Sequence, residues 1–123
     1  MKLVKKIINH RLILSINQLI ISGEDADKLF SMVNSEIIDT TRIFSVLIFR
    51  LKKVTIIDYS FAKMLVETYK ICFQNNVKVE LVDVSPKMQK KLENFNLKIF
   101  FDLNKTLNQV IEETQKHKKI SPE

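Results

Sequence analysis

Apolar residues follow two kinds of pattern along this chain, and the two patterns alternate. Short continuous runs, such as residues 46–49 and 54–57, are typical of buried strands. Other segments place apolar residues three or four positions apart, which is typical of a helix with one buried face. Strands that alternate with helices predict a layered α/β domain with a mostly parallel sheet of about four or five strands and about four helices.

The first 22 residues predict an antiparallel hairpin. Leu3–Ile8 and Arg11–Ile21 are rich in Ile, Leu and Val, and the polar pair Asn9-His10 separates them. A turn at Asn17-Gln18 would give a different register, and the pattern does not decide between the two turns. The only glycine, Gly23, follows this segment, where we expect a tight turn to use it.

The remaining elements follow from the same periodicities and from their end signals. We expect helices over residues 25–38 and 60–74, and we expect Asn75-Asn76 to end the second one in a left-handed conformation. Ser85-Pro86 is a helix-start signal, because serine caps a helix and proline fits its first turn. The expected strands are residues 43–51, 54–57 and 77–84, with a short edge strand over 97–101, and the expected caps of a final helix are Asp102 or Asn104.

Composition bounds the number of domains and the cellular compartment. The 123 residues suffice for a single domain, expected over residues 1–115, and the polar residues 116–123 are expected to form a disordered tail. Cys72 is the only cysteine, so no intrachain disulfide can form, and its apolar pattern favours a core thiol. No segment reaches the ~18 apolar residues of a membrane span. We therefore expect a cytoplasmic chain without membrane insertion.

Charge and residue types argue against nucleic-acid binding and catalysis. The formal net charge of +6 comes mostly from scattered lysines, and the chain has no tryptophan. Nucleic-acid surfaces usually cluster arginine and interleave aromatic rings, so we expect no nucleic-acid partner. The two histidines, His10 and His117, lie in a hairpin turn and in the tail, and the zinc, redox and glycine-rich phosphate motifs are all missing from the sequence. We predict a non-enzymatic chain without a cofactor.

The polar turn Asp58-Tyr59-Ser60 is the candidate functional feature. It follows the strand 54–57 and opens the helix 60–74. A helix start carries unpaired backbone N–H groups and a partial positive charge, which suits anion or partner recognition. Asp83 stands at the end of a neighbouring strand, and open α/β sheets place their sites along that edge. A capping role for Asp58 is an equally good interpretation.

These motifs, taken in order, resemble the STAS domain family over roughly residues 43–113. The resemblance consists of an apolar strand, then V-T-x-I-D ending at Asp58, then V-x-L-V-x-V-S-P ending at Pro86, then L-x-x-F-x-L, and then F-D-L-x-x-T-L ending at Leu107. The segment Ile21-Ser22-Gly23-Glu24 is similar to the S-G-E segment of the family. The resemblance implies a layered STAS-like α/β fold with an antiparallel N-terminal hairpin.

The resemblance also implies a regulatory role through protein–protein interaction. In the bacterial anti-sigma factor antagonists of this family, the turn is usually D-S-[ST]-G, and a kinase that is also the anti-sigma factor phosphorylates its first serine. This chain has Asp58-Tyr59-Ser60-Phe61 there, so a tyrosine stands at the acceptor position and Ser60 is the candidate phosphoacceptor. The family position that is commonly Asp is Arg50. We therefore interpret the loop more as a contact surface than as a phosphorylation switch.

Two kinds of protein partner stay open at this point. One is an anti-sigma factor kinase, and the other is a subunit of a phospholipid-transporting ABC system in which a small STAS subunit docks on the ATPase. A weak homodimer is a third alternative. The expected partner-binding loop is Asp58, Tyr59, Ser60 and Phe61, with secondary loop contacts at Gly23, Glu24, Asp83 and Ser85. Phe61 is either an exposed anchor or part of the core, and its spacing with Leu65 favours the core.

Overall fold

The computed structural model describes residues 1–120, and the side chains of residues 1–115. The strands are β1 (Leu3–Ile8), β2 (Arg11–Ile16), β3 (Ile20–Ile21), β4 (Val46–Arg50), β5 (Ile56–Ile57) and β6 (Lys78–Val82). The helices are α1 (Gly23–Ile38), α2 (Tyr59–Gln74), α3 (Pro86–Asn94), the short 3-10 helix η1 (Leu97–Ile99) and α4 (Leu107–Ile120). The predicted α/β class is therefore confirmed.

Four strands form the main sheet, in the order β1-β2-β4-β6. The pair β1–β2 is antiparallel, and the other two pairs are parallel. The hairpin turn lies at Asn9-His10, where Asn9 takes a left-handed φ of 57°, so the first of the two expected registers is confirmed. The two short strands β3 and β5 pair in parallel as a separate ribbon.

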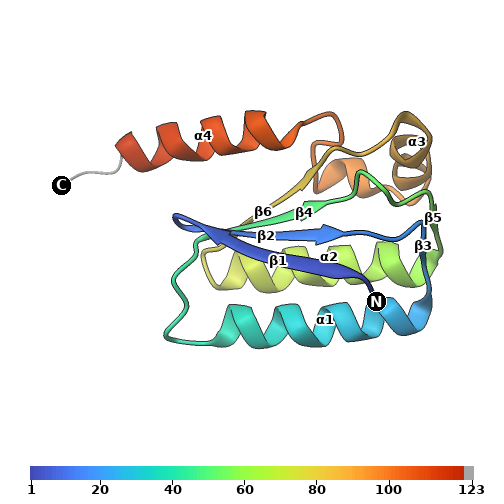
Figure 1. Cartoon of the computed structure of the whole chain (residues 1–123), viewed down its shortest axis with the longest axis horizontal. Coiled ribbons are helices and arrows are strands. Elements are labelled where there is room, and N and C mark those ends of the chain that lie inside the picture. The colour runs from blue at the N-terminus through green and yellow to red at the C-terminus, as the bar shows by residue number, and fades with distance from the viewer. Residues whose placement is uncertain (121–123) are drawn as a thin grey trace.

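Helices cover both faces of the sheet (Figure 1). The helices α1 and α2 lie on one face, and α4 crosses the other. Alternate residues of β4 divide between two apolar clusters, because side chains of a strand alternate between faces. Leu47 and Phe49 join the main core with α1 and α2, whereas Val46 and Ile48 pack with Val110 of α4. This division explains the continuous apolar run of β4, which indicates burial on both faces.

A buried arginine attaches α4 to the sheet. Arg11 is 2% exposed, and its Nε donates a hydrogen bond of 2.7 Å to Oγ1 of Thr114. Its Nη2 donates a second hydrogen bond of 3.0 Å to the carbonyl oxygen of Ile111. A buried guanidinium needs such partners, since an unpaired one would carry a large desolvation cost. The sequence does not reveal this contact, because the partners lie about a hundred positions away.

Local chemistry fixes most helix ends where the sequence predicts them. Asp58 and Ser85 are the N-caps of α2 and α3, and Asn76 takes a left-handed φ of 57° after α2. Gly23 differs from the prediction. It is the first residue of α1 rather than part of a tight turn, because Ser22 caps this helix through a reciprocal capping box with Asp25.

Two predictions near the C-terminus are wrong. The apolar run 97–101 is not an edge strand but begins with η1, since short apolar runs look alike in both structures. Helix α4 starts at Leu107, and its cap is Thr106, which exchanges two hydrogen bonds with Gln109. Asp102 instead accepts a hydrogen bond from the backbone N–H of Asn104, so these two residues form a turn before the cap.

Helix α4 also extends further than expected. It continues to Ile120, so residues 116–120 of the expected disordered tail are helical. Residues 121–123 of that expected tail lie outside the described residues. In Figure 1, the C-terminal part of α4 projects past the edge of the sheet.

Candidate functional site

The loop at Asp58 is positioned by the small ribbon of β3 and β5. The carbonyl oxygen of Leu19 accepts backbone hydrogen bonds from Thr55 and Ile56, at 2.9 and 3.0 Å. These bonds hold the strand that ends just before Asp58. Oδ1 of Asp58 then accepts a hydrogen bond of 3.3 Å from the backbone N–H of Phe61, which starts α2. The capping interpretation of Asp58 is therefore confirmed, and the loop has a fixed backbone.

The four residues of the predicted loop separate into exposed and buried positions. Asp58, Tyr59 and Ser60 are exposed, and the Tyr59 side chain is 66% exposed. Phe61 is fully buried and belongs to the main core with Leu65. The core alternative for Phe61 is therefore the correct one, because the first turn of α2 directs this side chain toward the sheet. The exposed loop available to a partner comprises Asp58, Tyr59 and Ser60.

The starts of α1 and α2 lie side by side. A Cβ atom placed on Gly23 would stand 3.3 Å from Oγ of Ser60 and 3.9 Å from Oδ2 of Asp58. A side chain at position 23 would crowd Ser60, so glycine suits this close approach, and its φ is not in the left-handed region. Glu24, in the same turn of α1, is exposed and pairs with Lys28 at 3.2 Å. The predicted secondary contacts Gly23 and Glu24 are therefore adjacent to the loop.

Asp83 and Ser85 have structural partners of their own. Oδ2 of Asp83 pairs with Nε of Arg50 at 2.8 Å, and its Oδ1 accepts a hydrogen bond of 3.3 Å from the backbone N–H of Leu107. Oγ of Ser85 accepts a hydrogen bond of 3.2 Å from the backbone N–H of Met88. Asp83 therefore joins the end of β6 to the start of α4, and Ser85 starts α3.

An exposed apolar patch lies beside the loop, and sequence reasoning missed it. The side chains of Leu19, Ile20 and Ile56 are 63%, 55% and 46% exposed. Ile20 and Ile56 are register partners in the β3–β5 ribbon, so they stand next to each other. Apolar side chains that gather on a surface usually mark an interaction site. We call these three residues the ribbon patch.

A groove between α2 and the segment that joins α3 to η1 continues from Tyr59. Its volume is about 300 Å³. The rings of Tyr59 and Phe95 lie 6.1 Å apart, centre to centre, at one part of its wall. The other lining residues are Ala62, Lys63, Val66, Glu67, Lys70 and Leu97. The groove therefore continues the exposed surface of the loop along α2.

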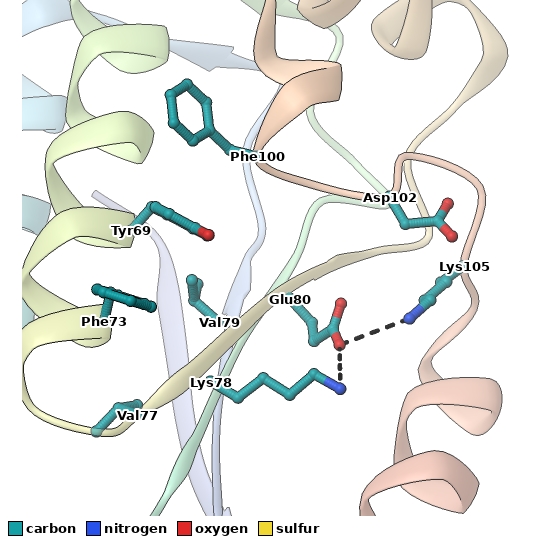
Figure 2. Close-up of a pocket in the computed structure, with 9 residues that line it drawn as sticks. All are labelled: Tyr69, Phe73, Val77, Lys78, Val79, Glu80, Phe100, Asp102 and Lys105. Atoms are coloured by element: carbon teal, nitrogen blue, oxygen red, sulfur yellow. Dashed lines mark ion pairs between the residues drawn. The ribbon is translucent and has the colours of Figure 1, made fainter.

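A second cavity lies at the other end of α2, beside β6 (Figure 2). It has a volume of about 340 Å³. Its aromatic wall is made by Tyr69, which stacks on Phe73 and meets Phe100 at a ring distance of 5.1 Å. On the opposite side, the Glu80 carboxylate lies 3.2 Å from Nζ of Lys78 and 3.6 Å from Nζ of Lys105. This buried acid is neutralised by its two lysines, as a stable buried carboxylate requires.

Burial and neighbouring charges shift the pKa values of Lys105, beside this cavity, and of Cys72, in the core. Burial alone would lower the pKa of Lys105, but its hydrogen bond to Glu113 and the carboxylates of Glu80 and Asp102 together raise it. Burial raises the pKa of the Cys72 thiol to about 12, against a small opposing effect of the Arg42 charge. Cys72 is fully buried, so the predicted core thiol is confirmed. Such a thiol is a poor nucleophile at neutral pH.

The described residues contain neither a metal cluster nor a membrane span. Within residues 1–115, no three His, Cys, Asp or Glu side chains gather in a way that could hold a metal ion. In the part of the chain that the structure describes, every helix is too short or too polar to cross a bilayer. The candidate site is the exposed loop together with the ribbon patch described above.

Solved structures of other proteins share this fold. The anti-sigma factor antagonist of Mycobacterium paratuberculosis superposes with a TM-score of 0.78 at 17% identity, over 93% of this chain and 93% of its own. SpoIIAA, an anti-sigma factor antagonist of Bacillus, superposes in its unphosphorylated form with a TM-score of 0.78 at 9% identity, over 94% and 97%. A sulfate transporter family protein of Wolinella succinogenes gives 0.72 at 18% identity, over 90% and 89%.

The fold thus defines a small layered α/β domain of the kind found in antagonists and in transporters. The family model of the STAS domain matches residues 2–112, and the chain belongs to this family. The match covers nearly the whole chain, from the hairpin to the first part of α4. No curated protein matches the chain in sequence.

Proposed function

We propose that this chain is a non-enzymatic regulatory module that resembles bacterial anti-sigma factor antagonists and binds a protein partner around the start of α2. The observation that carries the proposal is the ribbon patch beside the exposed loop. Leu19, Ile20 and Ile56 expose apolar area next to the polar groups of Asp58 and Ser60. An apolar centre with a polar rim is the usual anatomy of a protein interface.

Tyr59 is the expected anchor of this interface. Tyrosine contributes a large, rigid side chain at low entropic cost and is enriched among residues that dominate binding energy. Its ring is mostly exposed, yet it packs against Phe95 and so has a supported orientation. The groove between α2 and the segment after α3 includes this ring, so a partner that contacts Tyr59 can continue along α2.

The second candidate is an accessory subunit of a phospholipid-transporting ABC system. A bulky tyrosine at the position where antagonists carry a phosphorylated serine favours a contact that needs no phosphorylation. The accessory subunit would use the same surface as the antagonist, so the identity of the bound partner distinguishes the two functions. An anti-sigma factor kinase would select the antagonist, and a transporter ATPase or permease would select the accessory subunit.

Affinity capture from the native cell tests the proposal. The baits are the wild-type chain, Tyr59→Ala and the matched control Phe73→Ala, which removes an aromatic side chain that is 75% exposed at the other end of α2. We expect one specific partner to bind the wild type and the control but to be reduced about tenfold with Tyr59→Ala. Equal capture by all three baits would contradict the proposed surface.

A further inference from the structure

The carboxyl ends of β2 and β4 lie side by side and carry cationic and polar side chains. Ser15 of β2 is the register partner of Arg50 of β4, so both project from the same face of the sheet. Asn17 follows β2, and Lys52 and Lys53 follow β4. These five residues line a cavity of about 420 Å³, and its lining contains no carboxylate.

Arg50 is held in place at the edge of this cavity. Its Nε pairs with Oδ2 of Asp83 at 2.8 Å, and its side chain is 38% exposed. Asp83 is itself fixed, because it also accepts the backbone hydrogen bond from Leu107. The pair fixes one edge of the guanidinium, and within residues 1–115 neither Nη atom has a hydrogen-bond partner. A planar guanidinium can present two parallel donors to one anion.

The neighbouring charges are not balanced. Lys52 and Lys53 are exposed, and neither has an ion-pair partner among the side chains that the structure describes. Among the side chains of residues 1–115, Asp83 is the one carboxylate that pairs with this group, so three cations face a single negative charge. Like charges held together repel one another, and a bound anion would relieve that repulsion.

A neighbouring cavity, on the α4 side of Arg50, extends the region lined by cationic side chains. It has a volume of about 410 Å³ and shares Arg50 and Lys52 with the first. Its wall includes Thr106 and Leu107 at the start of α4. The backbone N–H of Leu107 is already bonded to Asp83, so this helix start adds a favourable field rather than a direct ligand.

We propose that the cavity between the ends of β2 and β4 binds a phosphate group. Arg50 would bind two oxygens of the phosphate, the ammonium groups of Lys52 and Lys53 would neutralise its charge, and the Ser15 hydroxyl and Asn17 amide would donate neutral hydrogen bonds. Cation number favours a dianionic phosphate over a singly charged carboxylate. Open parallel sheets bind ligands at this carboxyl edge, and here side chains supply what a glycine loop supplies elsewhere.

Titration of the full chain with inorganic phosphate at pH 7.5, followed through backbone amide chemical shifts, tests this site. Sodium chloride at matched ionic strength separates binding from screening. The test variant is Lys52→Gln/Lys53→Gln, and the matched control is Lys87→Gln/Lys90→Gln, which removes two exposed lysines of α3. Glycerol phosphate in place of inorganic phosphate asks whether the phosphate of an organic molecule is preferred.

We expect saturable shifts around Ser15, Asn17 and Arg50 that sodium chloride does not produce. The test variant should bind phosphate about tenfold more weakly, because charge-assisted hydrogen bonds are lost, and the control should match the wild type. Arg50→Lys should also weaken phosphate binding, since lysine keeps the positive charge but lacks the two parallel N–H donors of the guanidinium. Tighter binding of glycerol phosphate would identify an organic phosphate as the ligand.

The proposal is overturned if phosphate and chloride give the same shifts, or if the test and control variants bind phosphate equally. The two double variants remove exposed lysines that make no ion pair or hydrogen bond with the side chains of residues 1–115, so a retained amide spectrum verifies that they fold. The result does not depend on any protein partner, and it therefore stands or fails separately from the function proposed above.

Discussion

At the residue scale, two aromatic residues at the start of α2 have opposite roles, one at the surface and one in the core. Tyr59 is exposed and Phe61 is buried, although both are aromatic and only two positions apart. We expect Phe61→Ala to lower the free energy of unfolding by about 3–5 kcal/mol, as truncation of a core phenylalanine does. Tyr59→Ala should cost less than about 1 kcal/mol, since it removes one ring contact at the surface.

Urea denaturation of the two variants measures this difference directly. Similar losses of stability in both would mean that the Tyr59 ring is part of the core. A small loss for Tyr59→Ala also validates its use as a bait, because reduced partner binding by a stable variant cannot be attributed to unfolding.

Ser60 offers a prediction in which stability and binding move in different directions. It is exposed in the first turn of α2, where a negative charge is favourable to the helix dipole. We expect Ser60→Asp to fold as well as the wild type but to bind the captured partner about fivefold more weakly than Ser60→Ala does, because the new charge adds to Asp58. Calorimetry with the purified partner measures both affinities, and equal values would exclude a charge switch at this position.

At the element scale, the start of α1 depends on an ionised carboxylate. The backbone N–H of Ser22 is the main cause that lowers the pKa of Asp25, assisted by the side chains of Ser22 and Gln18 and opposed by burial. A carboxyl whose pKa is lowered by folding stabilises the fold above its unfolded pKa. That contribution is lost as the pH falls through the lower folded pKa.

Asp25→Asn should therefore be less stable than the wild type at pH 7, and the difference should shrink below about pH 4. Asp27→Asn is the matched control, since Asp27 is exposed on the same helix and makes no described hydrogen bond. Denaturation curves at pH 7 and pH 3 measure the effect. A difference that stays constant with pH would show that the cap does not need the charge.

Attachment of α4 is a second property at this scale. Arg11→Met keeps an apolar side chain under α4 but removes the hydrogen bonds to Thr114 and Ile111. We expect amide hydrogen exchange in α4 to become about 10- to 100-fold faster, while the sheet keeps its protection. Arg42→Met is the control, because Arg42 donates hydrogen bonds to the carbonyl oxygens of Ile37 and Asn75 and, within residues 1–115, makes none to α4. Unchanged α4 exchange in Arg11→Met would contradict this role.

At the scale of the whole molecule, the sequence predicts what local chemistry decides. The strand–helix alternation and the caps at Asp58 and Ser85 follow from neighbouring residues, and the structure confirms them. The loop at Asp58 could be placed for the same reason. The sequence leaves two hairpin turns open, and the structure selects the one at Asn9-His10. The resemblance of residues 43–113 to the STAS family also indicates the fold.

The features that the sequence does not predict depend on distant partners. Ile20 and Ile56 are exposed because they pair in the separate β3–β5 ribbon. The apolar pattern of the sequence alone predicts that they are buried in the core. The ion pair of Arg50 with Asp83 joins two strands across 33 positions. The run 97–101 is a different case, because its composition fits a strand and a 3-10 helix equally well.

The contact between Arg11 and α4 also bears on how the chain folds during synthesis. Arg11 and Thr114 are 103 positions apart, so this contact can form only after Thr114 has been synthesised. The hairpin, β4 and the helices of the first face can assemble earlier, since their contacts are more local. Until α4 leaves the ribosome, the face that carries Ile13, Val46 and Ile48 stays uncovered. An arrested nascent chain would therefore present this apolar face to chaperones, and docking of α4 would be the step that releases it.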